Sequence, residues 1–482
     1  MALNPNVPSG VTMKRKTLSL SLSALIALAF ALAFYSCAGG PPAVVEPPQA
    51  ALSAEELERL EMNAIFSLLE QGGMDEALAR LSVLEEKNPL NRDYPLLHAS
   101  VLMSMDRLND ARMLIKAELA EAADNLAALY ILSEIERFAG NAAAQRNALD
   151  ALIKADPGHA DGQAALGDLL YNGKNYRSAE EAYRKALSRE ENHVEALLGL
   201  ARVQYRREDV KGALETLDKA KAAAPGDPIV RLDRSRVLYE LGRYDECESE
   251  LDEAVRLAPD SAWNYVERGR LYLDTGRLSL AEADFSRSIE LNPDYFLPYV
   301  YRAGIREEAG MDMEALADYK LITKLYPDYW YAFESIGVLS YRLGLWKEAQ
   351  AAFDKAAASS SAHPEYYIAA GLSFMRGGEA RAAKDYASKA LPKINRERNP
   401  AEWLMLRLIF DQTDMSSELE LRIASEKSLD LKSSMLYYLG AYWLGRGRTE
   451  LGAKYIRMSY DENRQGTVAR RLAEADLKRL GK

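Results

Sequence analysis

Apolar residues recur along most of the chain at the spacing of an amphipathic helix, in blocks separated by short breaks. The block Trp263–Leu273 places apolar side chains three or four residues apart, so that they share one helical face. Gly276 follows and suits the left-handed end of a helix. A second block runs from Ser279 to Leu291, where Asn292-Pro293 ends it. This stretch therefore predicts an αα-hairpin, two helices joined by a short turn.

The hairpin pattern returns with a period of 34 residues. Three series of residues keep this phase over the body of the chain: the prolines Pro225, Pro259, Pro293 and Pro327, the glycines Gly242, Gly276, Gly310, Gly344 and Gly378, and the small residues Ala179, Ala213, Cys247, Ala281, Ala315, Ala349 and Ala383. Each such hairpin leaves an apolar face that only a neighbouring hairpin can cover. A long series of hairpins therefore predicts a stacked, all-α repeat protein.

At these residues the 34-residue unit resembles the tetratricopeptide repeat. Counted from Ala262, seven repeat positions carry the residue types typical of that family: Tyr265 (position 4), Gly269 (8), Tyr272 (11), Ala281 (20), Phe285 (24), Ser288 (27) and Pro293 (32). We number the repeat positions of every unit in this way. The resemblance is strongest between residues 160 and 390, and it implies a right-handed superhelical solenoid of about ten to twelve helix-turn-helix hairpins.

The period divides the chain into a predicted body and two ends. Residues 53–397 are predicted to form ten units in phase, which start at residues 58, 92, 126, 160, 194, 228, 262, 296, 330 and 364. Ser53 is a good N-cap for the first helix, and Glu56 completes a capping box. Residues 398–466 are predicted to form two degenerate hairpins, and residues 467–482 a polar capping helix or tail.

The N-terminal residues 1–36 are predicted to be an export signal with an upstream extension. The basic run Met13–Lys16 precedes the uncharged stretch Leu18–Phe34. Cys37 then follows a small residue, which resembles a bacterial lipobox, although Phe34 stands where that box prefers Leu. The resemblance implies a diacylated Cys37 at the start of a Pro-rich linker over residues 37–52. The alternative is an uncleaved signal anchor in which Cys37 is incidental.

Both interpretations of the N-terminus tether the protein to a membrane and place its body outside the cytoplasm. The lipidated form implies an exported lipoprotein at the periplasmic face of the outer membrane. The membrane is then a partner through the N-terminal lipid.

Composition and motifs exclude several classes of function. The net charge of −11 argues against nucleic acid as a partner. The two cysteines, Cys37 and Cys247, exclude a disulfide framework, and the four scattered histidines show no metal-ligand spacing, so neither a metal nor a cofactor is predicted. Cys247 fills the small-residue position of its unit and is predicted to be a packed core thiol. No catalytic motif is present and hairpins account for the body, so the protein is not predicted to be an enzyme.

Charged residues at repeat positions 7 and 23 vary together. Position 7 is arginine in three consecutive units, and the same three units are the only ones of the ten with an acid at position 23. This pattern predicts structural salt bridges between the two helices of each hairpin, rather than an anion-binding ladder. The predicted pairs are Arg234 with Glu250, Arg268 with Asp284, and Arg302 with Asp318.

The resemblance also implies a partner-binding face, because in this family the first helix of each hairpin lines a concave wall through positions 2, 5, 9, 12 and 13. Here these positions carry Arg202, Arg236 and Arg270 (position 9), Tyr171, Tyr205, Tyr239 and Tyr341 (12), Arg206 (13) and Trp263 (2). We find no acid in phase with the position 9 arginines. Such a face suits an extended peptide, an acidic segment or the C-terminus of another protein. The alternative is that the tyrosines only pack between repeats and the arginines are only solvated.

These observations favour a non-enzymatic scaffold or adaptor at the bacterial cell envelope, which binds segments of other proteins in its concave groove. The expected partners are proteins of envelope assembly, secretion or wall machinery. The alternative function is a substrate- or ligand-holding accessory of an envelope transport or secretion system.

Overall fold

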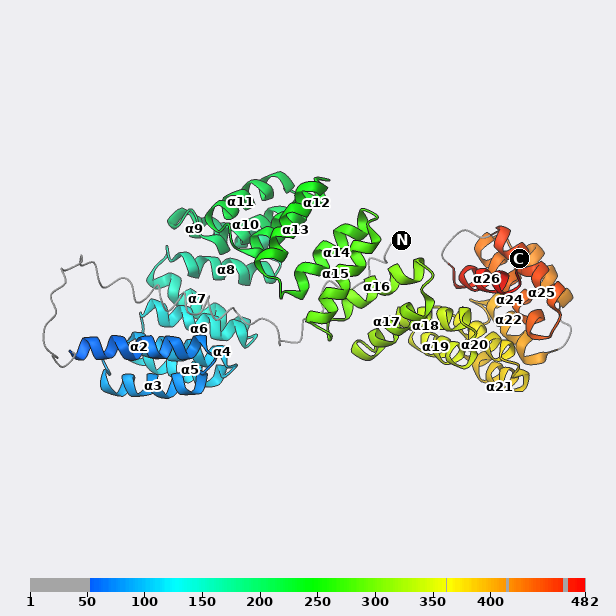
Figure 1. The fold of residues 1–482 in the computed structure, drawn as a ribbon, viewed down its shortest axis with the longest axis horizontal. Coiled ribbons are helices and arrows are strands. Elements are labelled where there is room, and N and C mark those ends of the chain that lie inside the picture. Colours follow the sequence, from blue (N-terminus) through cyan, green and yellow to red (C-terminus); the bar gives the residue numbers. More distant parts are fainter. Residues whose placement is uncertain (1–52, 361, 413–415, 463–466, 482) are drawn as a thin grey trace. The chain divides into compact units, whose positions relative to one another are not determined.

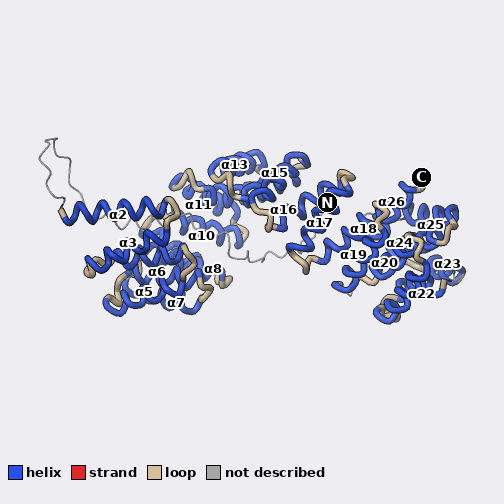
Figure 2. The backbone as a smooth tube through the Cα atoms, turned by 60° about the horizontal axis from the view of Figure 1, so that its bottom comes forward, coloured by secondary structure: helices blue, strands red, loops and turns tan. Residues whose placement is uncertain are grey.

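The computed structural model describes residues 53–360, 362–412, 416–462 and 467–481. Throughout these residues the regular structure is helical and contains no strand, which confirms the predicted all-α class (Figures 1 and 2). The predicted signal, Cys37 and the Pro-rich linker lie outside the described residues. Within the described part, no helix is both long and apolar enough to cross a membrane.

The protein divides into two compact units, one ending at Arg243 and the other beginning at Tyr244. We call these the first and the second unit; they are larger than the 34-residue repeat units, and each contains several of them. Each helix of the first unit packs against the next one along the sequence, from α2 to α12. They are α2 (Ala54–Glu70), α3 (Met74–Lys87), α4 (Asp93–Ser104), α5 (Leu108–Glu121), α6 (Leu126–Phe138), α7 (Ala142–Ala155), α8 (Ala160–Asn172), α9 (Tyr176–Arg189), α10 (Val194–Arg206), α11 (Val210–Ala223) and α12 (Pro228–Glu240).

The second unit continues the succession of helices and keeps the 34-residue period as far as α21. Its helices are α13 (Tyr244–Leu257), α14 (Ala262–Asp274), α15 (Leu278–Leu291), α16 (Phe296–Glu308), α17 (Asp312–Leu325), α18 (Trp330–Arg342), α19 (Trp346–Ser359), α20 (Glu365–Arg376), α21 (Ala380–Ala390), the 3-10 turn η2 (Leu391–Lys393), α22 (Pro400–Asp411), α23 (Ser416–Ser425), α24 (Leu429–Gly445), α25 (Thr449–Glu462) and α26 (Val468–Arg479).

Side chains at fixed repeat positions start the helices. The predicted capping box is confirmed, since Ser53 accepts from the Glu56 amide while the Glu56 carboxylate accepts from the Ser53 amide. Four residues spaced 34 apart then act as N-caps whose side chains accept a backbone N–H, namely Asn125, His159, His193 and Asp227. The two histidines therefore serve as helix caps.

Repeat position 15 ends the first helix of each in-phase unit. It adopts the left-handed conformation in all ten units, and glycine fills it in seven of them, as at Gly276 with a φ of 75°. The other three units place Asp106, Lys174 and Glu208 there, with φ between 60° and 65°. The turn geometry is therefore set by the repeat and is imposed even on residues with a Cβ.

A close approach between repeat positions 8 and 24 packs the two helices of a hairpin together. At Gly337, an added Cβ would lie 2.6 Å from Cε1 of the fully buried Phe353. A small residue at position 8 is thus required by the aromatic ring at position 24.

The last helix, α26, does more than cap the end of the repeat series. It is amphipathic, with Val468, Leu472 and Leu477 buried, and it packs against α25 and α24 (Figure 1). It also lies against α18, well over a hundred residues earlier in the sequence. The prediction of a polar capping helix over residues 467–482 missed both this apolar face and this contact.

Candidate functional site

The candidate site is the inner face, which we define as repeat positions 2, 5, 9, 12 and 13 of the first helices. In the first unit the structure places Tyr171 on α8, Arg202, Tyr205 and Arg206 on α10, and Arg236 and Tyr239 on α12. Trp263 and Arg270 lie on α14, which belongs to the second unit. The predicted binding residues therefore fall into two groups, of six and of two.

Within the first unit, α10 contacts its neighbours through polar groups of this face. Arg206 Nε donates to Tyr171 Oη across 3.4 Å, and the Arg206 side chain remains exposed. Tyr205 is half-buried and hydrogen-bonds to Glu240; burial and this bond raise the pKa of its phenol. Both rings keep exposed surface, so a bound segment could contact them as well as the guanidinium group of Arg206.

The position 9 arginines have acidic partners that the sequence pattern alone did not reveal to us. Arg202 Nε lies 2.6 Å from Asp233 Oδ2, and Arg236 Nη1 lies 3.1 Å from Asp233 Oδ1. In the second unit, Arg270 Nη1 lies 3.4 Å from Glu267 Oε2. Asp233 and Glu267 both fill repeat position 6 and are spaced 34 residues apart. The repeat period could therefore have indicated that these acids pair with the position 9 arginines.

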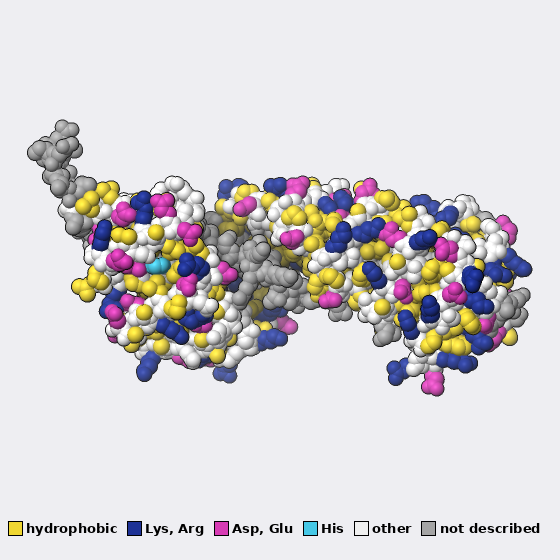
Figure 3. Space-filling view, turned by 90° about the horizontal axis from the view of Figure 1, so that it is seen from below, with side chains coloured by type: hydrophobic (Ala, Val, Ile, Leu, Met, Phe, Trp, Pro, Cys, Tyr) yellow, Lys and Arg dark blue, Asp and Glu magenta, His cyan; other side chains and the backbone are white. Residues whose placement is uncertain are grey.

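These pairs change the electrostatic character expected of the face. The Asp233 carboxylate is 8% exposed and serves two arginines, whereas the side chains of Arg202 and Arg236 keep 42% and 44% of their surface. Both basic side chains are thus partly exposed, and a buried acid partly compensates their charge. Figure 3 shows the same interspersion of basic and acidic side chains over the visible surface.

Sequence reasoning also missed Asp168, which fills position 9 on α8, one repeat before the three arginines. Its Oδ1 accepts from Tyr183 Oη across 2.6 Å. Burial raises the pKa of the Asp168 carboxyl, while this hydrogen bond and the charges of Arg202 and Arg137 act in the opposite direction. The inner face of α8 and α10 therefore places a partly buried acid near basic side chains.

In the second unit, Trp263 stacks on Tyr295 with ring centroids 6.2 Å apart and an angle of 27° between the planes. Tyr341, which fills position 12 on α18, is fully buried. The inner positions of this unit therefore carry a stacked aromatic pair on α14 and a fully buried tyrosine on α18.

Two of the three predicted salt bridges lie within one unit, and the structure brings their partners together. Arg268 donates to both oxygens of Asp284 across 2.8 Å each, and Arg302 holds Asp318 at 2.7 and 3.0 Å. Arg268 also reaches Asp252 of the preceding hairpin, at 2.8 Å. It therefore links the second helices of two successive hairpins.

The third predicted pair spans the two units. Arg234 lies in the first unit and Glu250 in the second, so this pair stays a prediction. Within the first unit, Arg234 Nε lies 2.8 Å from Asp218 Oδ1. Asp218 and Asp252 are 34 residues apart, so an acid before the arginine was also part of the repeat.

Three family models, each described as tetratricopeptide repeat, match residues 164–228, 208–267 and 264–295. Residues 164–295 thus match the tetratricopeptide repeat. This stretch contains the inner-face residues of α10, α12 and α14, and Asp168 and Tyr171 of α8.

Several solved structures are similar to part of this chain. One is a repeat protein from Parabacteroides merdae, with 19% identity, coverage of 51% of this chain and 97% of that chain, and a TM-score of 0.41. Another is PilF of Pseudomonas aeruginosa, with 18% identity, coverage of 42% and 92%, and a TM-score of 0.38. A third is YrrB, described as having an unusual peptide-binding site, with 21% identity, coverage of 38% and 95%, and a TM-score of 0.33. No curated protein matches the sequence.

The described residues contain no group of three or more His, Cys, Asp or Glu side chains that could hold a metal ion. Cys247 is 2% exposed, and burial raises the pKa of its thiol to about 12. At neutral pH this thiol is protonated and a poor nucleophile. The inner face itself presents charged, hydrogen-bonding and aromatic side chains.

Proposed function

We propose that the protein is a non-enzymatic scaffold that binds a segment of another protein on the inner face of α8, α10 and α12. The tetratricopeptide repeats of residues 164–295 support this proposal, because such repeats are generally protein-binding scaffolds. The observation that carries it is the set of exposed or half-exposed arginines and tyrosines on successive first helices, at the same repeat positions.

Arginine and tyrosine suit this role because they combine a large contact area with directed hydrogen bonds. Arg206 is the best-placed basic group, since it is exposed and donates to Tyr171, a neutral side chain. Arg202 and Arg236 are held by Asp233, so they fix the geometry of the face as well as its charge. A partner segment with a carboxylate opposite Arg206 and an apolar or aromatic group on Tyr171 and Tyr205 would fit this arrangement.

Charge reversal at Arg206 tests the proposal. Arg206→Glu should lower capture of the partner at least tenfold in pull-downs from cells that make the full-length protein, because it places a carboxylate against the partner's acid. Helix content and thermal stability should not change, since Arg206 is exposed. Arg177→Glu is the matched control, because Arg177 lies on the second helix α9 with 91% of its side chain exposed. Equal capture by both variants would contradict the proposed face.

We further propose that the scaffold works at the bacterial cell envelope, tethered by a lipid on Cys37. The support is the basic, then apolar, then Cys order of residues 13–37. Cells grown with an alkyne-tagged fatty acid should label the wild-type protein and not Cys37→Ala. Labelling of Cys37→Ala would contradict lipidation at that residue.

A further inference from the structure

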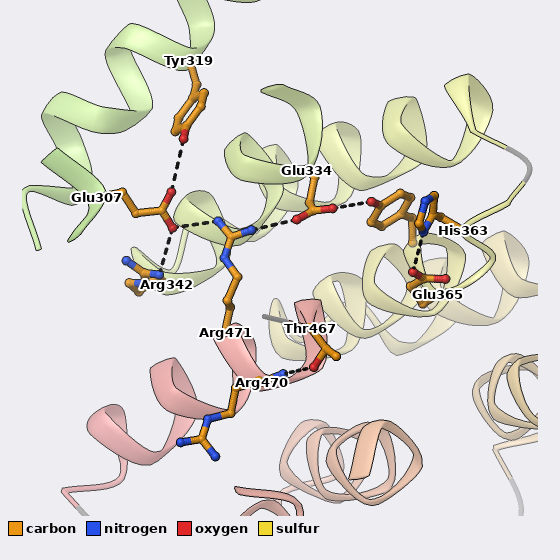
Figure 4. A network of polar contacts seen from close by, with 10 residues as sticks. Glu307, Tyr319, Glu334, Arg342, His363, Glu365, Thr467, Arg470 and Arg471 are labelled. Atoms are coloured by element: carbon orange, nitrogen blue, oxygen red, sulfur yellow. Dashed lines mark hydrogen bonds and ion pairs between the residues drawn. The ribbon is translucent and has the colours of Figure 1, made fainter. Parts of the chain in front are cut away.

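The last helix, α26, is anchored by an arginine that reaches two acids far away in the sequence. Arg471 Nη1 lies 2.8 Å from Glu334 Oε1 on α18, and Arg471 Nη2 lies 2.7 Å from Glu307 Oε1 on α16. Figure 4 shows the guanidinium group of Arg471 between these two carboxylates. Glu307 is 8% exposed, so this contact is mostly removed from solvent.

A second anchor is Asp476, which has no exposed surface. Its carboxylate accepts from Tyr341 Oη at 3.0 Å, from Tyr437 Oη at 3.3 Å and from Arg376 Nη2 at 2.8 Å. These donors come from three different helices, α18, α24 and α20. One acid of α26 thus accepts hydrogen bonds from the three helices on which α26 lies.

The residues that hold α26 occupy inner-face positions of the repeat. Glu307 and Tyr341 fill position 12, Glu334 fills position 5, and Arg376 fills position 13 of their units. Helix α26 therefore lies on the face of the second unit that corresponds to the candidate binding face of the first unit.

A comparison of equivalent positions shows what α26 covers. Position 12 is half-buried at Tyr171 and Tyr205 in the first unit but fully buried at Tyr341. Position 13 is exposed at Arg206, whereas the Arg376 side chain is only 14% exposed. The repeat therefore presents a surface that is accessible where no helix lies on it and closed where α26 does.

We propose that the inner face of α16, α18, α20 and α24 is a receptor for an amphipathic helix, and that α26 is its resident occupant. A partner helix displaces α26 if it carries an arginine and, five residues later, an aspartate, with apolar residues between them. In α26 those groups are Arg471 and Asp476, which match the acids Glu307 and Glu334 and the donors Tyr341, Tyr437 and Arg376. This second site is independent of the face proposed for α8, α10 and α12.

Competition with α26 explains why a free helix would bind only weakly to this face in the isolated protein. A tethered occupant acts at an effective concentration on the order of millimolar, so a free helix of equal intrinsic affinity binds weakly. Weakening α26 should then raise the apparent affinity for a free helix by the same factor.

The test uses the full-length protein and a fluorescent synthetic peptide with the sequence of residues 467–482. Arg471→Glu places a third carboxylate beside Glu307 and Glu334, so α26 should leave the face. The variant should bind the wild-type peptide one-to-one, at least a hundredfold more tightly than the wild-type protein does. Hydrogen exchange should show lost protection at residues 468–479 and retained protection in α16, α18 and α20. A peptide that itself carries Arg471→Glu should not bind.

Lys478→Glu is the control variant, because it reverses the same charge on the same helix at an exposed position. It should behave as the wild type in both measurements. The proposal is overturned if α26 stays protected in Arg471→Glu, or if it is released and the peptide does not bind. It is also overturned if α16, α18 and α20 lose protection together with α26, since α26 is then an integral part of the core. A dimer of the wild-type protein that the peptide dissociates would assign the face to a second copy and overturn the proposed partner.

Discussion

At the scale of single residues, the protein places arginines where they connect successive hairpins. Arg268 contacts Asp252, sixteen residues before it, and Asp284, sixteen residues after it. Arg302 contacts Ser286 and Asp318 with the same spacing. A planar guanidinium suits such a fork because its donors can face two acceptors at once. These pairs should therefore stabilise the register between neighbouring repeats.

Removal of Arg268 measures how much these ion pairs stabilise the hairpins. Arg268→Met leaves the Asp284 carboxylate, 8% exposed, without its bidentate partner and should cost about 2–4 kcal/mol, somewhat less than a fully buried pair. The double variant Arg268→Met with Asp284→Leu should regain most of this loss. Denaturant unfolding with hydrogen exchange at α14 and α15 measures both. Arg256→Met, which removes an exposed pair, should change nothing measurable. No loss in Arg268→Met would show that the pair is solvated.

His193 should make the first unit pH-dependent. Burial alone would lower the pKa of this imidazole, but its hydrogen bond to Asp161 and the nearby Glu195 raise it above its ordinary value. A raised pKa in the folded state gives stability that is full below the ordinary value of about 6.5 and is lost as pH rises through the folded pKa. The charged ring gives up the Nδ1 cap of the Ala196 amide, which only the neutral ring can accept, and we expect its contacts with Asp161 and Glu195 to outweigh that loss. Thermal unfolding should then show lower stability at pH 8 than at pH 6.

Asp161→Asn provides the matched variant, because it keeps an oxygen acceptor for His193 Nε2 and removes the charge. An NMR titration should show a lower pKa for His193 in this variant, and the difference in stability between pH 6 and pH 8 should shrink. An unchanged His193 pKa would mean that Asp161 is not the group that raises it.

At the scale of helices and turns, the period predicts much because local rules repeat. Apolar spacing marks each helix, and the glycine at position 15 and the proline at position 32 mark the helix ends. The helix bounds could therefore be predicted from the sequence. The histidine caps were harder to predict, since His159 and His193 are not among the preferred N-cap residues. The indication of their role was their 34-residue spacing from Asn125 and Asp227, which are preferred N-cap residues.

Position 15 offers a test at this scale. Lys174 has a φ of 60°, a conformation that costs a residue with a Cβ about 1 kcal/mol. Lys174→Gly should therefore raise the stability of the first unit by about 0.5–1 kcal/mol in thermal unfolding. Lys174→Ala removes the same charged side chain but keeps the Cβ, and should give no gain. Equal stability of the two variants would contradict a cost from the backbone at this turn.

Contacts between distant helices limited what the sequence could predict. The partners of Arg202 and Arg236 follow from Asp233 at position 6, but only once the neighbouring first helices are known to lie side by side. The docking of α26 on α18 depends on tertiary packing between segments 137 residues apart, as in the contact of Arg471 with Glu334. A helical pattern reveals that residues 468–479 have an apolar face, and it does not reveal which surface covers that face.

At the scale of the whole molecule, each described unit is a series of hairpins that mostly contact their neighbours in sequence. Stability in such proteins is roughly a sum of local and nearest-neighbour terms, so substitutions act on their own part of the series. This separation allows the face of α8, α10 and α12 to be altered without disturbing the helices under α26. The two proposed binding faces can therefore be tested one at a time.

A partner protein should bind to the inner face and not to the outer one. A photo-crosslinking amino acid placed in living cells at the inner positions of Tyr171 and Tyr205, and at the outer positions of Arg177 and Lys211, tests it most directly. One protein adduct of the same mass should form from both inner positions and be lost in Arg206→Glu, and none should form from the outer positions. Adducts of equal yield from both sets, or from the outer set alone, would contradict it.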